Sequence, residues 1–525
     1  MNIFKLLLGL VLILPSSCEE NESYDKNSNN QIIKNHVQLT TIDIDAKTEF
    51  QTLEHFGASD AWSCQYIGNW PNEKKEAIAN LLFSNEVDVQ GNPLGIGLSL
   101  WRFNIGAGSA SQGASSNIND EWRRTESFLQ KNGTYDWSKQ RGQLWFAQAA
   151  KTKGVDKLLV FPNSPHINFT KNGRANADGA ISNLTENNYE TFGDYLANVI
   201  EGLQNLGLTV DYVSPVNEPQ WDWADGQEGS PFFNDEIAAI VRSLNTKLIE
   251  KNITTKIDIA EAGQLNFLYE KGNKGDRGNQ INEFFSTGSS NYIGDLTNVS
   301  HTISGHSYFT TYPFSTLIEK RTKLAEKIKS TNGLRFWMSE YTILEDNVEI
   351  KGQGRDLGIN PALYIAKVIH SDLAIANATA WHWWLAISPY DYKDGLIYVD
   401  KNKHDGNYHE SKMLWALGNY SRFIKPGYKR IKLTSQANSK DIGSLNSNFL
   451  FSGYKNPHTN EAIVVLVNSG SDKKNIQLEH QGEKIIQIKS YVTSNGKNLE
   501  FVDLIENDMI SIPGKSIVTI TIDSL

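Results

Sequence analysis

The sequence predicts a (β/α)8 TIM barrel of the α/β class with an appended small all-β sandwich domain. Short β-type runs alternate with amphipathic stretches of helical periodicity up to about residue 420, and eight such units in sequence are typical of this barrel. After Pro426 the pattern changes to short alternating or β-branched runs, which predicts the second domain. Of the 525 residues, 39% are hydrophobic, which excludes wholesale disorder.

The N-terminus predicts export. Residues 1–17 have a short charged head and an apolar run too short to span a bilayer, which indicates a signal peptide. Leu14-Pro15-Ser16-Ser17-Cys18 resembles a bacterial lipoprotein signal in which Cys18 is lipidated; the alternative is an ordinary cleaved signal. Residues 18–40 are polar and predict a flexible tether, and the acidic stretch after Cys18 resembles that of surface-exposed lipoproteins. We therefore expect an outer-membrane or cell-surface lipoprotein whose lipid anchor is its only membrane contact.

The barrel is expected over residues 41–425 and the β domain over 426–525. The predicted barrel strands are residues 55–58, 97–103, 157–161, 211–216, 256–260, 302–306, 335–339 and 378–383. Helices are predicted at 189–205 and 236–252. Residues 36–50 form one or two further strands, for which pairing with the β domain is an open alternative.

Charge and composition limit the partners. The 50 basic and 60 acidic residues give a net charge of −10 without a basic stripe, which argues against nucleic acid. The 13 Trp, 20 Tyr and 22 Phe residues suit flat sugar faces as well as cores. The histidines lack metal-ligand spacing and no glycine-rich phosphate loop follows a strand, so we expect no metal and no cofactor. A monomer is expected.

Two carboxylates mark the expected active site. Active sites of such barrels lie at the carboxyl ends of the strands. Glu218 follows the fourth predicted strand and Glu340 the seventh, on opposite sides of the barrel mouth. Such a pair suits cleavage of a glycosidic bond, where one carboxyl protonates the departing oxygen and the other attacks or stabilises the anomeric carbon.

Several motifs resemble a known family. Asn217-Glu218-Pro219 with a Glu on strand seven resembles the retaining (β/α)8 glycosidase clan. The segments Phe56 to Trp62 and Trp101 to Gly106, together with the terminal β domain, resemble glycoside hydrolase family 30. The segments Ser59 to Gln65 and Ala107 to Ala110 are most similar to its endo-β-1,6-galactanase branch, whereas other branches cleave β-1,6-glucan, xylan or glucosylceramide.

The resemblance implies roles for three residues. Glu218 would be the general acid and then the base, and Glu340 the nucleophile that forms a glycosyl-enzyme intermediate. Asn217 would hydrogen-bond the sugar 2-hydroxyl, a contact that strengthens in the transition state.

Other polar residues at strand ends are candidates for substrate binding. Arg102 is placed to orient Glu340, with a structural ion pair as the alternative. His306 and Tyr308 are placed to donate to the nucleophile or to a hydroxyl, although a lone histidine is usually a satisfied core group. Asp60 and Trp62 follow the first predicted strand. They are expected to contact hydroxyls of the sugar in the subsite that is cleaved, with loop capping as the alternative for Asp60.

Strand eight carries a cluster of tryptophans, of which Trp381 is expected to form the floor beneath the sugar, with plain packing as the alternative. Asn163, His166 and Trp221 are weaker candidates for flanking subsites.

The predicted function is a retaining endo-β-1,6-galactanase that acts on arabinogalactan side chains by double displacement. One alternative keeps the retaining enzyme and makes the substrate β-1,6-glucan or xylan. The other is a glycan-binding lipoprotein that kept the barrel and lost catalysis.

Overall fold

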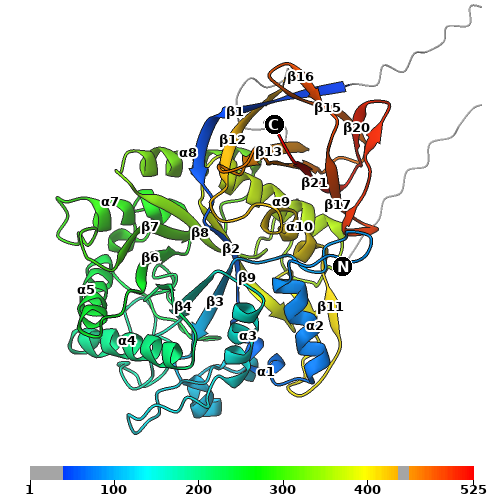
Figure 1. Ribbon diagram of the computed structural model, residues 1–525. Coiled ribbons are helices and arrows are strands. Elements are labelled where there is room, and N and C mark those ends of the chain that lie inside the picture. Colours follow the sequence, from blue (N-terminus) through cyan, green and yellow to red (C-terminus); the bar gives the residue numbers. More distant parts are fainter. Residues whose placement is uncertain (1–38, 436–447) are drawn as a thin grey trace, which may run out of the picture. The chain divides into compact units, whose positions relative to one another are not determined.

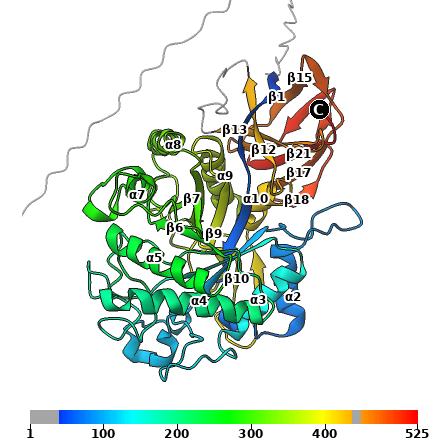
Figure 2. The same cartoon turned by 60° about the vertical axis from the view of Figure 1, so that its left-hand side comes forward.

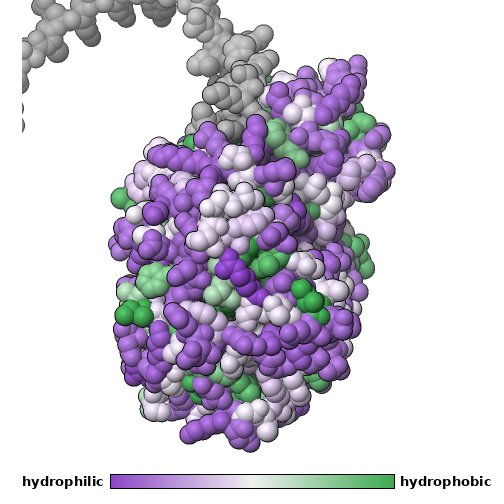
Figure 3. Space-filling view, turned by 90° about the vertical axis from the view of Figure 1, so that its left-hand side faces the viewer, coloured by the Kyte–Doolittle hydropathy of each residue, from purple (hydrophilic) through white to green (hydrophobic). Residues whose placement is uncertain are grey.

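The computed structural model describes residues 39–435 and 448–525. The predicted signal peptide, Cys18 and residues 18–38 of the predicted tether lie outside the described residues. None of the helices in the described part of the chain is long and apolar enough to cross a membrane. Figure 3 shows one face of the molecule, which is mostly hydrophilic with hydrophobic residues in small separate groups.

Eight parallel strands close into a barrel, which confirms the predicted fold class (Figure 1). Each strand pairs with the next along the chain, and β9 returns to pair with β2. The barrel strands are β2 (His55–Ser59), β3 (Leu100–Ile105), β4 (Lys157–Pro162), β5 (Tyr212–Val213), β6 (Lys256–Ala262), β7 (Val299–His306), β8 (Arg335–Tyr341) and β9 (Ala380–Ser388). Each of them overlaps one of the predicted strands.

Helices alternate with these strands and cover the outside of the barrel (Figure 2). The longer ones are α2 (Asn72–Phe83), α3 (Arg141–Thr152), α4 (Tyr189–Asn205), α5 (Asn234–Glu250), α8 (Phe314–Lys329), α9 (Ile359–Ala374) and α10 (Lys412–Ser421). Shorter helical turns are α1 (Cys64–Ile67), α6 (Asn266–Tyr269) and α7 (Gln280–Phe285). In α4, buried residues such as Leu196, Val199, Ile200 and Leu203 recur at helical spacing, so one stripe packs on the strands.

Side chains fill the interior of the barrel. Leu100, Leu159, Phe161 and Trp337 form one buried cluster there, and His55 packs edge-on against the Trp337 ring. Because the interior is packed, a ligand is accommodated only at the mouth, where strand ends and loops meet.

The second domain is one continuous sheet of 11 strands that curls around its own apolar core. Its strands are β1 (Leu39–Thr52), β12 (Lys429–Ser435), β13 (Phe449–Lys455), β14 (Ala462–Asn468), β15 (Lys474–His480), β16 (Glu483–Ile485), β17 (Lys489–Ser494), β18 (Lys497–Phe501), β19 (Ile505–Glu506), β20 (Met509–Ile512) and β21 (Ser516–Ile522). Residues that are far apart in the sequence, such as Ile42, Leu466 and Ile520, meet in that core. One curled sheet thus provides the apolar core that two facing sheets provide in a sandwich.

The N-terminal strand β1 belongs to this second sheet, where it pairs antiparallel with β12 and parallel with β15. Between the barrel and the sheet, Asn419 Nδ2 of α10 donates to the hydroxyl of Thr519 on β21 (2.9 Å), and that hydroxyl donates to the backbone carbonyl of Asn419 (2.7 Å). Two further strands, β10 (Gly395–Val399) and β11 (Tyr408–Glu410), extend the barrel sheet beside β9.

Candidate active site

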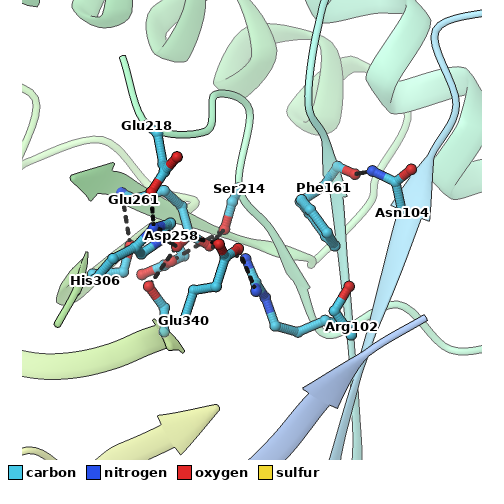
Figure 4. A network of polar contacts seen from close by, with 12 residues as sticks. Arg102, Asn104, Phe161, Ser214, Glu218, Asp258, Glu261, His306 and Glu340 are labelled. Atoms are coloured by element: carbon cyan, nitrogen blue, oxygen red, sulfur yellow. Dashed lines mark hydrogen bonds and ion pairs between the residues drawn. The ribbon is translucent and has the colours of Figure 1, made fainter. Parts of the chain in front are cut away.

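The two predicted catalytic carboxylates meet at the mouth of the barrel. Glu340 lies near the carboxyl end of β8, and Glu218 lies in the loop after β5, where its φ of 44° is in the left-handed region. The Glu218 backbone N–H donates to the carbonyl of Glu261 (2.8 Å), which fixes this loop to the end of β6. One carboxylate oxygen of Glu218, one of Glu340 and a ring nitrogen of His306 all lie within 4.8 Å of one another (Figure 4).

Two donors hold Glu340. Arg102 donates from Nη1 to Glu340 Oε2 (3.0 Å), and the Tyr308 hydroxyl donates to Oε1 (3.0 Å). Both oxygens are thus engaged, so the carboxylate cannot turn freely in the cavity. Arg102 is fully buried, and its guanidinium lies over the Phe161 ring, 4.3 Å from the ring centroid. The structure therefore places Arg102 and Tyr308 on the expected nucleophile.

Burial and one cation act in opposite directions on Glu218. Burial raises the pKa of Glu218 above its ordinary value of 4.5, and the bond from His306 Nδ1 to Oε1 (2.8 Å) opposes that rise. The raised pKa favours the protonated carboxyl that a general acid needs. Asn217, the preceding residue, lines the same cavity with its buried Oδ1 unpaired in the described structure, so its side chain is available to a ligand.

His306 lies between two carboxylates. Its Nδ1 is 2.8 Å from Glu218 Oε1 and its Nε2 is 2.8 Å from Glu261 Oε2. Burial lowers the pKa of His306, but the Glu340 charge and the bonds to Glu218 and Glu261 outweigh it and raise that pKa to about 10. At neutral pH the ring is therefore a doubly protonated cation that donates to both partners.

This protonation state also bears on metal binding. Glu218, His306 and Glu340 are close enough to hold a metal ion. A doubly protonated imidazole, however, has no free lone pair to offer, so the ring is not a ligand in this state. The arrangement suits proton transfer and nucleophilic attack by the carboxyl groups.

Glu261 is a member of this site that the sequence reasoning missed. It lies at the end of β6 and is fully buried. Its carboxylate accepts from Arg102 Nη2 (3.1 Å), Ser214 Oγ (2.9 Å) and the hydroxyl of Ser339, besides His306. The signal that drew attention to Glu218 and Glu340, an acidic residue at a barrel strand end, was also present at Glu261.

Glu218 and Glu340 open into a cavity of about 460 Å³. Aromatic rings form much of its wall, and acidic, basic and amide side chains complete it. The lining residues are Trp62, Arg123, Asn217, Glu218, Trp223, Gln227, Tyr308, Glu340, Thr342, Leu344, Trp384, Tyr390, Asp391, Tyr392 and Asp394. Trp62 meets the rings of Trp384 (5.4 Å between centroids) and Tyr390 (6.0 Å) edge to face. Apolar ring surface beside two carboxylates suits a sugar, which has an apolar face and hydroxyl edges.

The structure corrects the expectation for Trp381. Its side chain is fully buried and donates from Nε1 to Asp372 of α9 (2.9 Å), so it faces the helix layer. Trp384 lines the cavity instead. Alternation along β9 sends Trp381 and Trp384 to opposite faces, and the inward face is that of Trp384.

The expectation for Asp60 is corrected as well. Its Oδ1 accepts from the backbone N–H of Asn104 (2.7 Å) and from Gln143 Nε2 (3.1 Å), and the residue is fully buried outside the cavity lining. Burial raises the pKa of Asp60 to about 8. This is the capping role that was the alternative, whereas Trp62 does line the cavity.

The three weaker candidates lie outside the cavity lining. His166 bonds to the Leu129 carbonyl (3.0 Å), and burial lowers its pKa to about 4. Trp221 packs against Phe267. Asn163 is buried, with both side-chain polar atoms unpaired in the described structure.

The chain is similar to known glycoside hydrolases. The family model for O-glycosyl hydrolase family 30 matches residues 39–398. An endo-β-1,6-galactanase from Hypocrea rufa is 25% identical over 406 residues, which cover 74% of this chain and 75% of that protein. A glucuronoxylanase from Bacillus subtilis (strain 168) is 21% identical over 364 residues, 68% of this chain and 71% of that protein.

A solved structure is similar over nearly the whole chain. The crystal structure of a conserved exported protein from Bacteroides fragilis is 33% identical, with a TM-score of 0.86, and the match covers 92% of this chain and 100% of that one. The family match spans the barrel strands β2 to β9 and the helices between them, and it includes Glu218 and Glu340. The chain therefore belongs to O-glycosyl hydrolase family 30.

Proposed function

We propose that the protein is a retaining β-glycosidase that hydrolyses β-1,6-linked galactan. The observation that carries the retaining mechanism is the approach of Glu218 and Glu340, whose nearest carboxylate oxygens lie within 4.8 Å. Retaining enzymes place their carboxyl groups about 5–5.5 Å apart, whereas inverting enzymes need about 6.5–9.5 Å to admit a water.

The reaction then proceeds in two steps. Glu340 attacks the anomeric carbon as the glycosidic bond breaks, and the proton of Glu218 passes to the departing oxygen. A water molecule then enters and gives a proton to Glu218, which acts as the base. The oxygen of this water attacks the anomeric carbon and displaces Glu340 from the sugar. Arg102 and Tyr308 hold Glu340 in line for attack, and Asn217 hydrogen-bonds the sugar 2-hydroxyl.

The galactan substrate is proposed from the fungal relative. The Hypocrea rufa protein is an endo-β-1,6-galactanase, and its match covers about three quarters of each chain. Trp62, Trp384 and Tyr390 form an apolar wall of the cavity. The flat apolar face of a galactose ring can pack against this wall. Arabinogalactan, which carries β-1,6-galactan side chains, is the proposed natural polymer.

The test is product analysis on de-arabinosylated arabinogalactan, β-1,6-glucan and glucuronoxylan, with anomeric configuration followed by NMR. We expect short β-1,6-galacto-oligosaccharides of retained configuration from the wild type and none from Glu340→Gln. Glu345→Gln is the matched control, because Glu345 is also buried and hydrogen-bonded just after β8 but lies outside the cavity lining.

Each other outcome has a defined meaning. Activity on glucan or xylan alone would overturn the substrate and keep the two glutamates. Binding without hydrolysis across the panel would support a glycan-binding protein, and an inverted product would overturn the mechanism.

We further propose that the protein is a monomeric lipoprotein of the cell surface, anchored through Cys18. The 33% identical relative from Bacteroides fragilis is described as an exported protein, which supports export. Labelled fatty acid should enter the wild-type protein and not Cys18→Ala, and protease added to whole cells should digest it. Sedimentation of the detergent-solubilised protein tests the monomer.

A further inference from the structure

Glu261 is a buried carboxylate that the two-step mechanism does not use directly. It is fully buried and is not part of the cavity wall, so a bound sugar does not reach it. Burial opposes its ionisation, but the Arg102 charge and the bond from His306 outweigh that effect and hold the pKa of Glu261 well below its ordinary range. A permanent negative charge therefore lies directly beneath the catalytic pair.

Two of its partners each reach one catalytic glutamate. Arg102 donates from Nη2 to Glu261 (3.1 Å) and from Nη1 to Glu340 (3.0 Å). His306 donates from Nε2 to Glu261 (2.8 Å) and from Nδ1 to Glu218 (2.8 Å). Glu261 is thus the shared counter-ion of the two cations, one beside the nucleophile and one beside the acid (Figure 4).

The main chain and a hydroxyl add to these links. The Glu218 N–H donates to the Glu261 carbonyl (2.8 Å), and the hydroxyl of Ser339, which precedes the nucleophile, donates to the Glu261 carboxylate. One residue therefore contacts the segments that carry both glutamates.

We propose that Glu261 is a positioning residue that sets Arg102 against Glu340 and His306 against Glu218, and keeps the charge of the buried cluster balanced during the reaction. This inference rests on the double-displacement function proposed above. It concerns how the two cations are held, and it adds no group that touches the substrate.

Charge counting shows why the third carboxylate matters. Before attack, the cations Arg102 and His306 face the anions Glu261 and Glu340, while Glu218 carries its proton. After attack, Glu340 is a neutral ester and Glu218 is the anion, because its proton has left with the departing oxygen. The cluster therefore carries two positive and two negative charges both before and after the attack. His306 lies 2.8 Å from Glu218 Oε1 and 3.7 Å from Glu340 Oε1, so it faces both states.

The same count fails without Glu261. The two cations would then face one anion throughout, and a buried unbalanced charge is costly. His306 would give up its proton more readily and would no longer donate to both carboxylates.

The charged and titratable groups around Glu261 come from five strands. They are Arg102 of β3, Asp258 of β6, His306 of β7, Glu340 of β8 and His382 of β9. Burial raises the pKa of Asp258 to about 8 and lowers that of His382 well below its ordinary value, so both are neutral at pH 7. The charges that act on Glu261 at that pH are those of the two cations and the nucleophile.

The experiment compares Glu261→Gln with Asp258→Asn in the full chain. Asp258 is a matched control because it is an equally buried carboxyl on the same strand that bonds to Ser214 and Thr302 and to neither catalytic cation. We expect Glu261→Gln to lower kcat about 100-fold with KM unchanged, since small displacements of reacting groups cost about that much. Asp258→Asn should keep the kcat of the wild type.

A second readout needs no substrate. In ¹⁵N NMR spectra, the His306 ring of the wild type should stay doubly protonated at pH 8, and that of Glu261→Gln should have lost a proton. The His306 resonance is identified by its absence from His306→Asn. Wild-type kcat together with an unchanged His306 titration in Glu261→Gln would overturn the inference.

The two readouts separate the inference from the proposed function. If the wild type hydrolyses no glycan but His306 responds to Glu261→Gln, the proposed function fails and the positioning role stands. If Glu261→Gln does not fold, Glu261→Asp serves instead, because it keeps the charge and retracts it by one methylene. It should leave His306 doubly protonated and still lower kcat, and a wild-type kcat would overturn the positioning role.

Discussion

Arg102 is a buried cation that pairs with Glu340, the proposed nucleophile, and its removal gives a prediction whose size follows from the structure. The guanidinium is fully buried and forms ion pairs with Glu340 (3.0 Å) and Glu261 (3.1 Å). At an effective dielectric constant of about 20, each pair at this distance contributes about 5 kcal/mol of Coulomb energy. The cost of burying the three charges offsets much of that sum.

Arg102→Met removes the cation and leaves both carboxylates behind. Removing one partner of a buried pair costs about 3–5 kcal/mol, because the other charge stays buried without compensation. We therefore expect the free energy of unfolding to fall by that amount. The stability of Arg102→Lys should lie between those of the wild type and Arg102→Met. A single ammonium group cannot replace the two guanidinium nitrogens that donate to Glu340 and Glu261.

Chemical denaturation followed by tryptophan fluorescence measures this difference. The matched control is Lys323→Met, because Lys323 forms an even shorter pair with Glu319 (2.6 Å), but on the exposed surface of α8. An exposed pair of this kind contributes little to stability, because water and salt screen it. If Arg102→Met loses no more stability than Lys323→Met, burial does not make the loss of the Arg102 cation costly, and the prediction is wrong.

Three further predictions concern catalysis and the cavity wall. Glu218→Gln should lower kcat by about 10²–10⁴ on a polysaccharide with KM unchanged, the usual contribution of a general acid, and initial-rate kinetics check this. Burial raises the pKa of Glu218, and the first step needs its protonated form. As the pH is raised, kcat/KM should therefore stay constant past pH 4.5 and fall only when the pH passes the raised pKa. A fall on the alkaline side that begins below pH 4.5 would contradict this. Trp384→Ala should raise KM for oligosaccharides, because Trp384 lines the cavity. Trp381→Phe removes the donor to Asp372, so it should lower the free energy of unfolding by about 1–3 kcal/mol and leave KM unchanged. Chemical denaturation and initial-rate kinetics measure the two effects.

Most of the barrel was predictable because its strands differ in composition from what surrounds them. The short apolar runs between polar loops mark β2 to β9, and the amphipathic spacing of α4 marks the helix layer. The expectation for Glu218 and Glu340 used the same information, since carboxyl ends of parallel strands meet at one end of a barrel. That the two side chains converge within 4.8 Å depends on tertiary packing, which the sequence does not display.

The orientation of β9 shows where the sequence signal ended. Every residue of β9 is buried, so burial does not distinguish the face toward the barrel interior from the face toward the helices. Alternation separates Trp381 from Trp384 but does not say which one points inward. The register shift between β2 and β9 at Ser59 and Leu385 adds a local irregularity beside these residues.

Glu261 and Asp60 were hidden for a different reason. Glu261 directly follows the predicted strand 256–260, as Glu340 follows its own, but the strand end alone does not show that its carboxylate meets Arg102 and His306. Asp60 was a plausible sugar contact by position alone, but the backbone N–H of Asn104 on β3 meets it first. Which donor reaches a buried carboxylate depends on neighbouring strands, and local sequence carries little information about that.

Trapping the glycosyl-enzyme intermediate would show whether Glu340 is the nucleophile of a retaining reaction. A 2-deoxy-2-fluoro β-1,6-galactobiosyl donor with a good leaving group would be incubated with the wild type and with Glu340→Gln, and the protein would be analysed by intact mass and peptide mapping. We expect one added fluorogalactobiosyl group, a disaccharide, on the peptide that contains Glu340, and none on the variant. A label on Glu218 or on another side chain in the wild type would contradict it.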